Sequence, residues 1–359
     1  MRRQWRPRTV LGCMSGTSCD GVDVVAVSWG GDGRPQLLAH AAYDWGDLAD
    51  RVRAYADGAA LSAGASRHLQ RDLAQAHIEA IARLPAELQM QAELVAVHGQ
   101  TVYHAPPLSW QMIDAAWIAA RLSRPVVTDF RSADLAAGGQ GAPITPLADQ
   151  ELFPGKGCRA VVNLGGFINI TLLDNERVCS GRDLCLANQL LDRAARTWLQ
   201  QPFDMDGACA STGQPQAQAT AQLAQELMSQ NQGRSLGTAD QVTPWIQRWQ
   251  PHLSAADALA SICQAIATCL HDQLQHDRPH TVWLAGGGVA NAALLQAIAR
   301  TCTGMRVVSS DAAGVPPLQR EAAAMAILAR RLAMRQAITI PAVTGCTAPA
   351  PLGATWIYP

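Results

Sequence analysis

Short apolar runs separated by glycine-rich turns recur along the chain and predict β-strands. The first two runs span 9–14 and 22–29 and flank a polar turn at 15–21. Both runs are rich in β-branched residues, which is typical of two adjacent strands in a hairpin. A similar arrangement returns at 159–173, where two apolar runs flank a pair of glycines. The pattern therefore predicts a strand–glycine turn–strand unit in each half, and suggests two duplicated lobes.

The other apolar positions fall into short runs typical of buried strands and longer amphipathic stretches typical of helices. Further strands are predicted at 36–42, 94–97, 125–131, 281–284 and 306–309. Helices are predicted over 48–81 with a break at 62–66, over 111–122, 189–199, 214–228 and 321–334, and after a capping-box-like start at Ser254. The chain is therefore a mixture of helices and strands.

The length of 359 residues is too great for one small core and indicates two lobes. Hydrophobic residues make up 48% and charged residues 16%, which is typical of a globular protein. The strongest loop signal in the chain is Gly-Gly-Gln-Gly-Ala-Pro-Ile-Thr-Pro at 138–146. It indicates a connection between lobes, and we place the boundary shortly after it, at 153–157. We therefore predict an N-terminal lobe at 1–156 and a C-terminal lobe at 157–359.

Charge and cysteine content limit the kinds of partner and the compartment that we expect for the protein. The net charge is −1 and no Lys/Arg run stands out, so neither nucleic acid nor an anionic membrane is the expected partner. No apolar run approaches the roughly 18 residues of a membrane span, and no apolar segment of a secretory signal follows the basic N-terminus. The ten cysteines form no C-x-x-C pair, which favours reduced thiols in a cytosolic protein.

The turn between the first two strands carries groups typical of phosphate binding. Glycines let backbone N–H groups approach a ligand, hydroxyls add donors, and carboxylates suit a magnesium ion that bridges phosphate oxygens. These groups are Gly16, Thr17, Ser18, Asp20, Gly21 and, just beyond, Asp23. The alternative is an ordinary hairpin loop, because the same residue types form turns.

Polar side chains at the ends of predicted strands are further candidates, since open α/β sheets bind ligands there. His98 either points into a cleft or is satisfied by nearby backbone. Asp129 and Arg131 either hold each other as an ion pair, or Arg131 faces a substrate. Asp183 precedes a predicted helix and is either a cap or a catalytic carboxylate.

Two further glycine turns are candidate ligand sites. Gly165 and Gly166 either help to hold a phosphate or form a tight hairpin turn. Gly286, Gly287 and Gly288 lie between a predicted strand and a predicted helix, where a nucleotide base or phosphate can rest on backbone.

Motifs spread in order over nearly the whole chain resemble those of the anhydro-N-acetylmuramic acid kinases. This family belongs to the superfamily of sugar kinases, heat-shock chaperone ATPases and actin. The motifs lie at 14–23, with Cys19 where leucine is usual, and at 97–104, 129–131, 137–143, 163–169, 286–291 and 352–354.

The resemblance implies an α/β, two-lobed actin-like ATPase fold with ATP in the cleft between the lobes. It implies a reaction in which water opens the 1,6-anhydro ring of the sugar while the freed O6 takes the γ-phosphate of ATP. The product is N-acetylmuramic acid 6-phosphate, the setting is cell-wall recycling in the bacterial cytoplasm, and the usual assembly is a homodimer.

The resemblance also assigns roles to residues. Asp183 activates the water, and Asp20 and Asp23 orient Mg²⁺ through water. The sugar side is lined by His98, Gln100, Thr101 and Arg131. The nucleotide contacts are Gly16, Thr17, Ser18, Cys19, Asp20, Gly21, Val22, Asp23, Gly165, Gly166, Gly286, Gly287 and Gly288.

Two stretches depart from the family pattern. The family surrounds its catalytic aspartate with Phe before it and Thr-Gly-Pro after it, whereas this chain reads Arg182-Asp183-Leu-Cys-Leu. A stretch resembling Lys-Ser-Thr-Gly-Arg-Glu appears at 234–239 as Arg-Ser-Leu-Gly-Thr-Ala. Two alternatives therefore stay open: a related kinase for another sugar, and a nucleotide-binding paralogue without catalysis.

Overall fold

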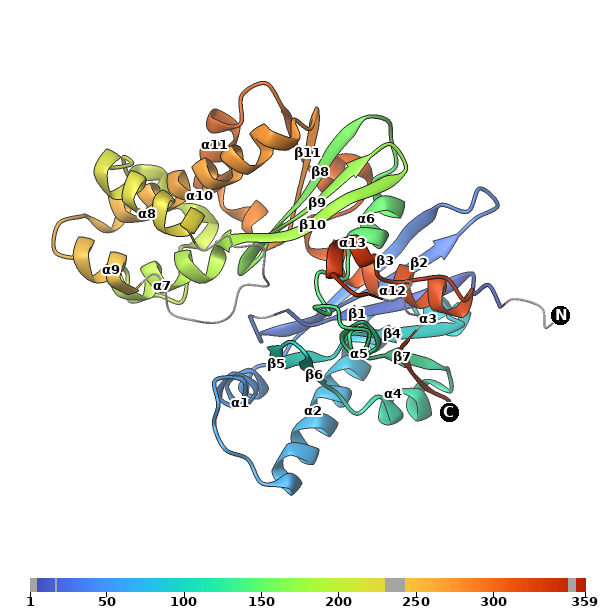
Figure 1. The fold of residues 1–359 in the computed structure, drawn as a ribbon. Coiled ribbons are helices and arrows are strands. Elements are labelled where there is room, and N and C mark those ends of the chain that lie inside the picture. Colours follow the sequence, from blue (N-terminus) through green and yellow to red (C-terminus); the bar gives the residue numbers. More distant parts are fainter. Residues whose placement is uncertain (1–4, 17, 230–242, 348–352) are drawn as a thin grey trace. The chain divides into compact units, whose positions relative to one another are not determined.

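A computed structural model describes residues 5–16, 18–229, 243–347 and 353–359 (Figure 1). The contacts divide the chain into two compact units. Unit 1 comprises 1–153 together with 319–359, and unit 2 comprises 154–318. The division near 153 agrees with the predicted boundary region, but residues 319–359 belong to unit 1 and not to the second lobe in which the sequence placed them.

Unit 1 contains a six-stranded sheet in the order β13-β7-β4-β1-β2-β3. Strands β1, β2 and β3 form an antiparallel meander, β4 and β7 continue the sheet in parallel with β1, and β13 closes it antiparallel to β7. The strands are β1 (Thr9–Met14), β2 (Gly21–Trp29), β3 (Pro35–Asp44), β4 (Leu94–Val97), β7 (Val126–Thr128) and β13 (Thr355–Ile357).

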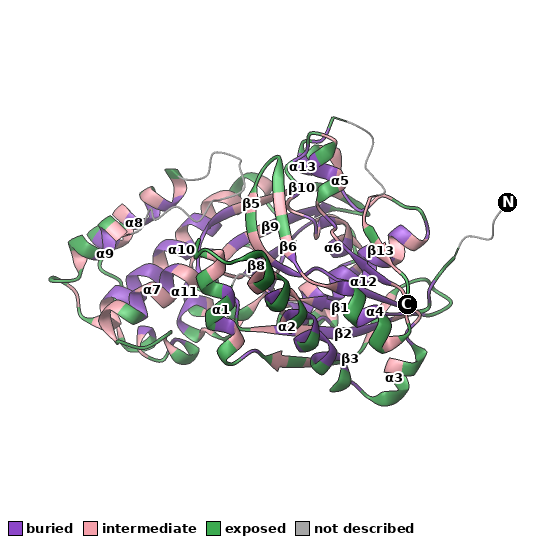
Figure 2. Cartoon of the chain, turned by 90° about the horizontal axis from the view of Figure 1, so that it is seen from below, coloured by how far each residue is buried: buried purple, intermediate pink, exposed green. Residues whose placement is uncertain are grey.

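Helix α12 (Arg320–Ala333) explains why the C-terminal segment belongs to unit 1. It packs on β1 at Gly12, where an added Cβ would lie 2.0 Å from the carbonyl oxygen of Ala322. Only glycine permits this close approach of helix and strand. Small buried alanines line the helix, and the buried residues shown in purple in Figure 2 run along it. The sequence predicts an apolar helix here, but not which sheet it covers.

The other helices of unit 1 come between its strands in the order of the chain. They are α1 (Asp47–Ala56), α2 (Ala63–Ala82), α3 (Ala86–Gln91), α4 (Ala115–Leu122), α5 (Ser132–Ala136), α6 (Pro146–Leu152) and α13 (Pro341–Thr344). The helix predicted over 48–81 is interrupted as expected, but at 57–62 and not at 62–66, because the Ser62 hydroxyl accepts the Ala65 N–H and starts α2.

The helix predicted over 111–122 is wrong at its start. Its first residues belong to β6 (Leu108–Met112), which pairs with β5 (Gln100–Ala105) as a two-stranded hairpin. The chain after α12 continues with the short helix α13.

Unit 2 contains a five-stranded sheet in the order β10-β9-β8-β11-β12. Its strands are β8 (Cys158–Leu164), β9 (Phe167–Asp174), β10 (Arg177–Leu186), β11 (Thr281–Ala285) and β12 (Arg306–Ser309). An antiparallel meander is again followed by two parallel strands, as in the order β3-β2-β1-β4-β7 of unit 1. The predicted duplication is therefore confirmed by topology.

The helices of unit 2 are α7 (Asn188–Trp198), α8 (Ala217–Ser229), α9 (Thr243–Trp249), α10 (Ala255–Asp277) and α11 (Ala292–Thr301). The long helix α10 lies at the centre of their packing, with twelve buried residues. The predicted cap is confirmed, since the Ser254 hydroxyl accepts the Asp257 N–H over 3.1 Å. No helix in the described part of the chain combines the length and apolar character needed to cross a bilayer.

Candidate active site

The loop between β1 and β2 turns at Cys19. The Cys19 N–H donates to the Gly16 carbonyl over 3.2 Å, and Cys19 adopts a left-handed φ of 52°. Its side chain is buried, as is that of Val22, and burial raises the pKa of the Cys19 thiol to about 11. A ligand at this loop therefore meets the backbone of these two residues and not their side chains. Thr17 lies outside the described residues.

The two loop glycines have different surroundings. Among the described residues beyond its chain neighbours, a Cβ on Gly16 would meet the Ser18 hydroxyl alone, at 3.5 Å, which leaves room for a ligand at its backbone. A Cβ on Gly21 would lie 2.7 Å from the Tyr43 carbonyl oxygen on β3. Gly21 is thus required by the packing of β2 on β3, which is a structural reason independent of any ligand.

Three carboxylates of unit 1 influence one another at this loop. Asp20 accepts the Ser18 hydroxyl over 2.8 Å. Burial raises the pKa of Asp23 to about 6, with further contributions from Asp20 and Glu321. Burial also raises the pKa of Glu321, which opens α12, although Arg320 and Arg131 oppose the shift. A cation bound here would relieve this accumulation of negative charge.

Glu321 was missed by the sequence reasoning, although the Arg-Glu pair at the start of an alanine-rich helix is a visible signal. Within the described residues, no group of three His, Cys, Asp or Glu side chains is placed to hold a metal ion. The donors nevertheless fit Mg²⁺, which keeps several waters and uses only one or two carboxylates together with phosphate oxygens.

His98 directly follows β4 and is fixed at both ring nitrogens. Its Nδ1 lies 2.8 Å from the Gly99 carbonyl, and its Nε2 lies 3.0 Å from Arg131 Nη2. Burial and the Arg131 charge lower the pKa of His98 to about 3, so the ring is neutral. Nδ1–H therefore donates to Gly99, and Nε2 accepts from Arg131. As the second interpretation of His98 expects, nearby backbone satisfies one nitrogen, and Arg131 satisfies the other.

Arg131 also donates from Nη1 to the Gly141 carbonyl over 2.6 Å. Asp129, the partner considered for it, accepts the Ser132 N–H at the start of α5. The guanidinium thus joins the strand end at His98 to the glycine-rich loop after α5.

The β5–β6 hairpin carries the other two predicted sugar residues. Gln100 is fully buried, and its Nε2 donates to the Cys19 sulfur over 3.2 Å. Its Oε1 is also buried, with no hydrogen-bond partner among the residues that the structure describes. Thr101 accepts the Gln111 side-chain amide on the opposite strand over 3.2 Å. A buried acceptor without a donor is costly, so Gln100 Oε1 is suited to a ligand that supplies an O–H or N–H.

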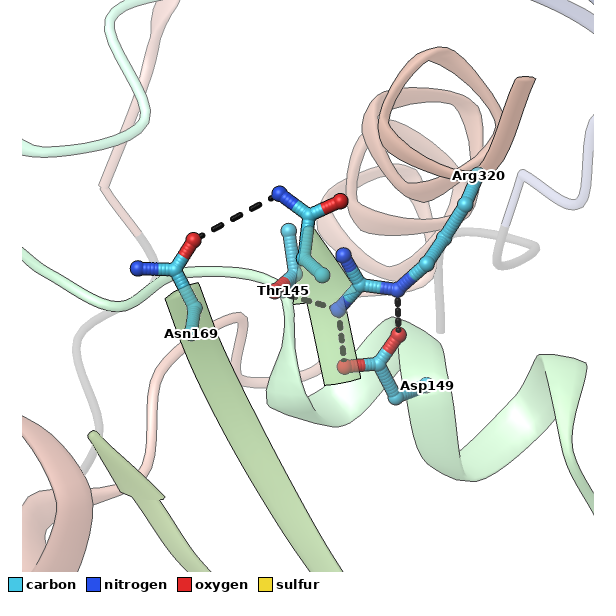
Figure 3. A network of polar contacts seen from close by, with 5 residues as sticks. Thr145, Asp149, Asn169 and Arg320 are labelled. Atoms are coloured by element: carbon cyan, nitrogen blue, oxygen red, sulfur yellow. Dashed lines mark hydrogen bonds and ion pairs between the residues drawn. The ribbon is translucent and has the colours of Figure 1, made fainter. Parts of the chain in front are cut away.

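A buried ion pair anchors the start of α12 (Figure 3). Arg320 Nε donates to Asp149 Oδ1 over 2.7 Å, and Nη2 reaches Asp149 Oδ2 at 2.5 Å and the Thr145 hydroxyl at 3.1 Å. Both charged side chains are almost completely buried. The bidentate pair fixes Arg320, the residue that precedes Glu321. Nothing in the sequence pattern pointed to this pair.

Asp183 lies in unit 2 at the end of a row of polar side chains across three strands. Asn163, Asn169 and Asp183 are register partners on β8, β9 and β10. The Asn169 amide donates to the Asp183 carboxylate, and Asn163 donates to Asn169 Oδ1 over 3.5 Å, the contact drawn in Figure 3. Since a carboxylate only accepts, it fixes the orientation of both amides. The cap interpretation of Asp183 is wrong, because the residue lies on β10 and α7 begins at Asn188.

The Gly165-Gly166 turn is a two-residue hairpin with a second role. The Gly165 carbonyl accepts the Asn188 N–H over 3.1 Å, and the Gly166 carbonyl accepts the Ala187 N–H over 2.8 Å. The turn therefore satisfies the first N–H groups of α7. These N–H groups of α7 are therefore engaged, and a phosphate at this turn has to be held by donors other than them.

The second glycine turn of unit 2 packs against the end of β8, just before the first. A Cβ on Gly286 would lie 2.7 Å from Asn163 Oδ1, and a Cβ on Gly288 would lie 2.8 Å from the Leu164 Cβ. Gly287 is different: it is exposed, and its Cβ would have no neighbour closer than 3.8 Å. The predicted strand–glycine turn–helix element is confirmed, and it lies beside the end of β8.

Comparison with known proteins gives the same family as the motifs. The model of the family "Anhydro-N-acetylmuramic acid kinase" matches residues 8–359. The chain belongs to this family. A protein of that name from Synechococcus sp. (strain CC9605) is 38% identical over 379 residues, covering 96% of this chain and 98% of the relative. One from Bordetella petrii is 37% identical over 375 residues, covering 98% and 96%. The two-lobed sugar-kinase fold expected from the motifs is thereby confirmed.

The residues after Asp183, which differ from the family pattern, are part of the hydrophobic core of unit 2. Leu184, Cys185 and Leu186 are buried, and the register of β10 shifts between Asp183 and Leu186. A hydrogen bond with Cys269 on α10 and burial both raise the pKa of Cys185. Apolar packing thus replaces the glycine-proline turn of the family. The altered stretch at 234–239 lies outside the described residues.

Proposed function

We propose that this protein is an ATP-dependent kinase that opens 1,6-anhydro-N-acetylmuramic acid and phosphorylates it at O6. Water adds to C1, the C1–O6 bond breaks, and O6 takes the γ-phosphoryl group as ADP leaves. The observation that carries the proposal is the Asp183 carboxylate, oriented by Asn169 and joined through Asn163 to the Gly286 turn. Together with the family membership, this arrangement supports a carboxylate placed for chemistry and not for helix capping.

Asp183 acts as the general base in this proposal. A carboxylate near the anomeric carbon takes the proton of the attacking water as the new C1–O bond forms. The hydrogen bond from Asn169 fixes the direction in which this carboxylate points. The proton leaves the water, and the electron pair of the broken C1–O6 bond stays on O6.

The nucleotide is held mainly by backbone and by charge. We assign the triphosphate to the N–H groups of 16–23 and 165–166, and the nucleoside end to 286–288. Asp20 and Asp23 hold Mg²⁺ through water. The ion, when bound, neutralises charge on the phosphate oxygens during transfer.

The sugar is assigned to His98, Gln100, Thr101 and Arg131. The buried, unpartnered Gln100 Oε1 supports this assignment, because a sugar hydroxyl or acetamido N–H supplies the missing donor. His98 is neutral and already engaged with Arg131, so it orients that guanidinium for the substrate. We further propose a cytoplasmic homodimer that serves cell-wall recycling, which light scattering and cell fractionation test directly.

The decisive experiment measures ADP release from purified protein with ATP, Mg²⁺ and 1,6-anhydro-N-acetylmuramic acid, and compares the wild type with Asp183→Asn. Turnover that the substitution abolishes supports the proposal. ADP release only with a different sugar of a panel favours the related-kinase alternative. ATP binding by calorimetry without turnover of any sugar favours the non-catalytic alternative, and either result overturns the proposal.

A further inference from the structure

A buried carboxylate that the site assignments leave out, Asp134 on α5, holds the glycine-rich loop at 137–141. Asp134 is 1% exposed. Its Oδ2 accepts the Gly141 N–H over 2.8 Å, and its main-chain carbonyl accepts the Gly139 N–H over 2.9 Å. A Cβ on Gly139 would lie 2.1 Å from Asp134 Oδ2, so the loop wraps the carboxylate as closely as its glycines permit.

Asp134 and the loop at 137–141 form a clamp together with Thr344 of the C-terminal segment. The Thr344 hydroxyl donates to Asp134 Oδ1 over 2.6 Å, and Thr344 is 1% exposed. The Thr344 carbonyl accepts the Gln140 N–H over 2.7 Å. One carboxylate therefore joins α5 and the loop that directly follows it to the end of α13, where Thr344 lies 210 residues further along the chain.

The clamp ends at a candidate sugar residue. Gly141 donates its N–H to Asp134 and accepts Arg131 Nη1 at its carbonyl over 2.6 Å. The same guanidinium binds His98 Nε2. The chain of contacts from Thr344 through Asp134, Gly141 and Arg131 to His98 is continuous, and each contact lies within unit 1.

We propose that Asp134 is a positioning residue for the sugar site, which it serves by fixing the Gly141 carbonyl and, through it, the guanidinium of Arg131. The proposal rests on the proposed function, since it takes Arg131 as a sugar contact. Displacing a binding group by about an ångström is enough to weaken a site on the order of a hundredfold. Because the Thr344 hydroxyl donates to Asp134, the C-terminal segment takes part in the same positioning.

The kinetic test compares Asp134→Ala, Asp134→Asn and Thr344→Val with Val52→Ala, a core substitution on α1 that lowers stability away from the clamp. Asp134→Ala and Thr344→Val are expected to raise KM for the anhydro-sugar about tenfold or more, with kcat and KM for ATP within about threefold. Asparagine can rotate so that its oxygen accepts from Gly141 while its NH₂ donates to the Thr344 hydroxyl, so Asp134→Asn restores most of the affinity.

A second readout does not depend on turnover. In ¹⁵N-histidine-labelled protein without ligands, the His98 Nε2 resonance reports the bond from Arg131. It should shift in Asp134→Ala and Thr344→Val and stay unchanged in Val52→Ala. If the wild type turns over no sugar but the His98 shift appears, the proposed function fails and the clamp stands. An unchanged His98 resonance in both clamp variants, or a KM no different from that of Val52→Ala, overturns the inference; Thr344→Val decides it if Asp134→Ala does not fold.

Discussion

Asp183 accepts a hydrogen bond from the side-chain amide of Asn169, its register partner on the neighbouring strand β9. The contact comes from strand pairing and not from sequence proximity, since the two residues are separated by a whole hairpin. It gives the proposed general base a fixed direction on a rigid element, where catalytic groups are held more accurately than on loops.

Asn169→Leu removes the donor and keeps a side chain of similar size. We expect kcat to fall about tenfold or more, because the amide both orients the carboxylate and stabilises its ionised form. The acidic limb of the pH–rate profile should move to higher pH, which stopped-flow ADP release at pH 4.5–8 measures. Ile170→Val, at the next position of β9 and in the core, should leave the profile unchanged. A fall in kcat without a shift of the acidic limb contradicts a role for the amide in ionisation.

The pKa of Asp23, raised to about 6 by burial and by neighbouring carboxylates, predicts a pH-dependent response to Mg²⁺. Below this pH the carboxyl is neutral, so the apparent affinity for Mg²⁺ should rise as the pH increases from 5 to 7. Asp23→Asn should flatten this dependence, whereas Asp32→Asn, an exposed acid of the same unit, should not. Titrations of activity with Mg²⁺ at fixed pH provide the measurement.

The same shift has a consequence for stability. Because the folded-state pKa of Asp23 lies above its ordinary value of 3.8, folding favours the protonated form, and this contribution to stability is lost as the pH rises through about 6. Asp23→Asn should therefore raise the Tm by a few degrees at pH 8 and have little effect at pH 4. Equal effects at both pH values would show that the substitution acts through packing.

Neighbouring glycines of the 286–288 turn provide a matched pair of variants. Gly288→Ala places a Cβ 2.8 Å from Leu164 Cβ and 3.0 Å from Asn188 Oδ1, so the turn has to move. We expect KM for ATP to rise about tenfold or more. Gly287→Ala meets no atom closer than 3.8 Å, and its KM should stay within about twofold of the wild type. Equal KM values for the two variants would remove this turn from the nucleotide site.

The Arg320–Asp149 pair should behave as a buried ion pair. Arg320→Met leaves the Asp149 carboxylate without its guanidinium, and we expect a loss of about 3–5 kcal/mol of stability. The double variant Arg320→Met with Asp149→Leu should recover part of that loss, because no buried charge remains. Arg51→Met breaks an exposed pair with Asp72 and should cost less than about 1 kcal/mol. Thermal unfolding of the wild type, Arg320→Met, Asp149→Leu and the double variant measures the coupling, and additive losses from the two single changes would contradict it.

The sequence by itself determined the local elements of this protein and the list of candidate groups. Strand β1 at 9–14, β4 at 94–97 and β12 at 306–309 have the predicted bounds, because each is a short apolar run bounded by turns or polar residues. The duplicated strand–glycine turn–strand units followed from the same local signals. The motifs around Asp20, His98 and the glycine turns also gave the family.

Only the tertiary structure decided how these groups are connected. The register that aligns Asn163, Asn169 and Asp183, the packing of α12 on Gly12, and the clamp from Thr344 to Arg131 all join segments remote in the chain. Hydrophobic period and turn chemistry act over a few residues, so they specify elements but carry no information on which distant backbone or side chain each element meets. Which buried polar groups contact one another depends on how distant elements pack, which is why the roles of Asp134, Asp149 and Asn169 emerged only from the fold.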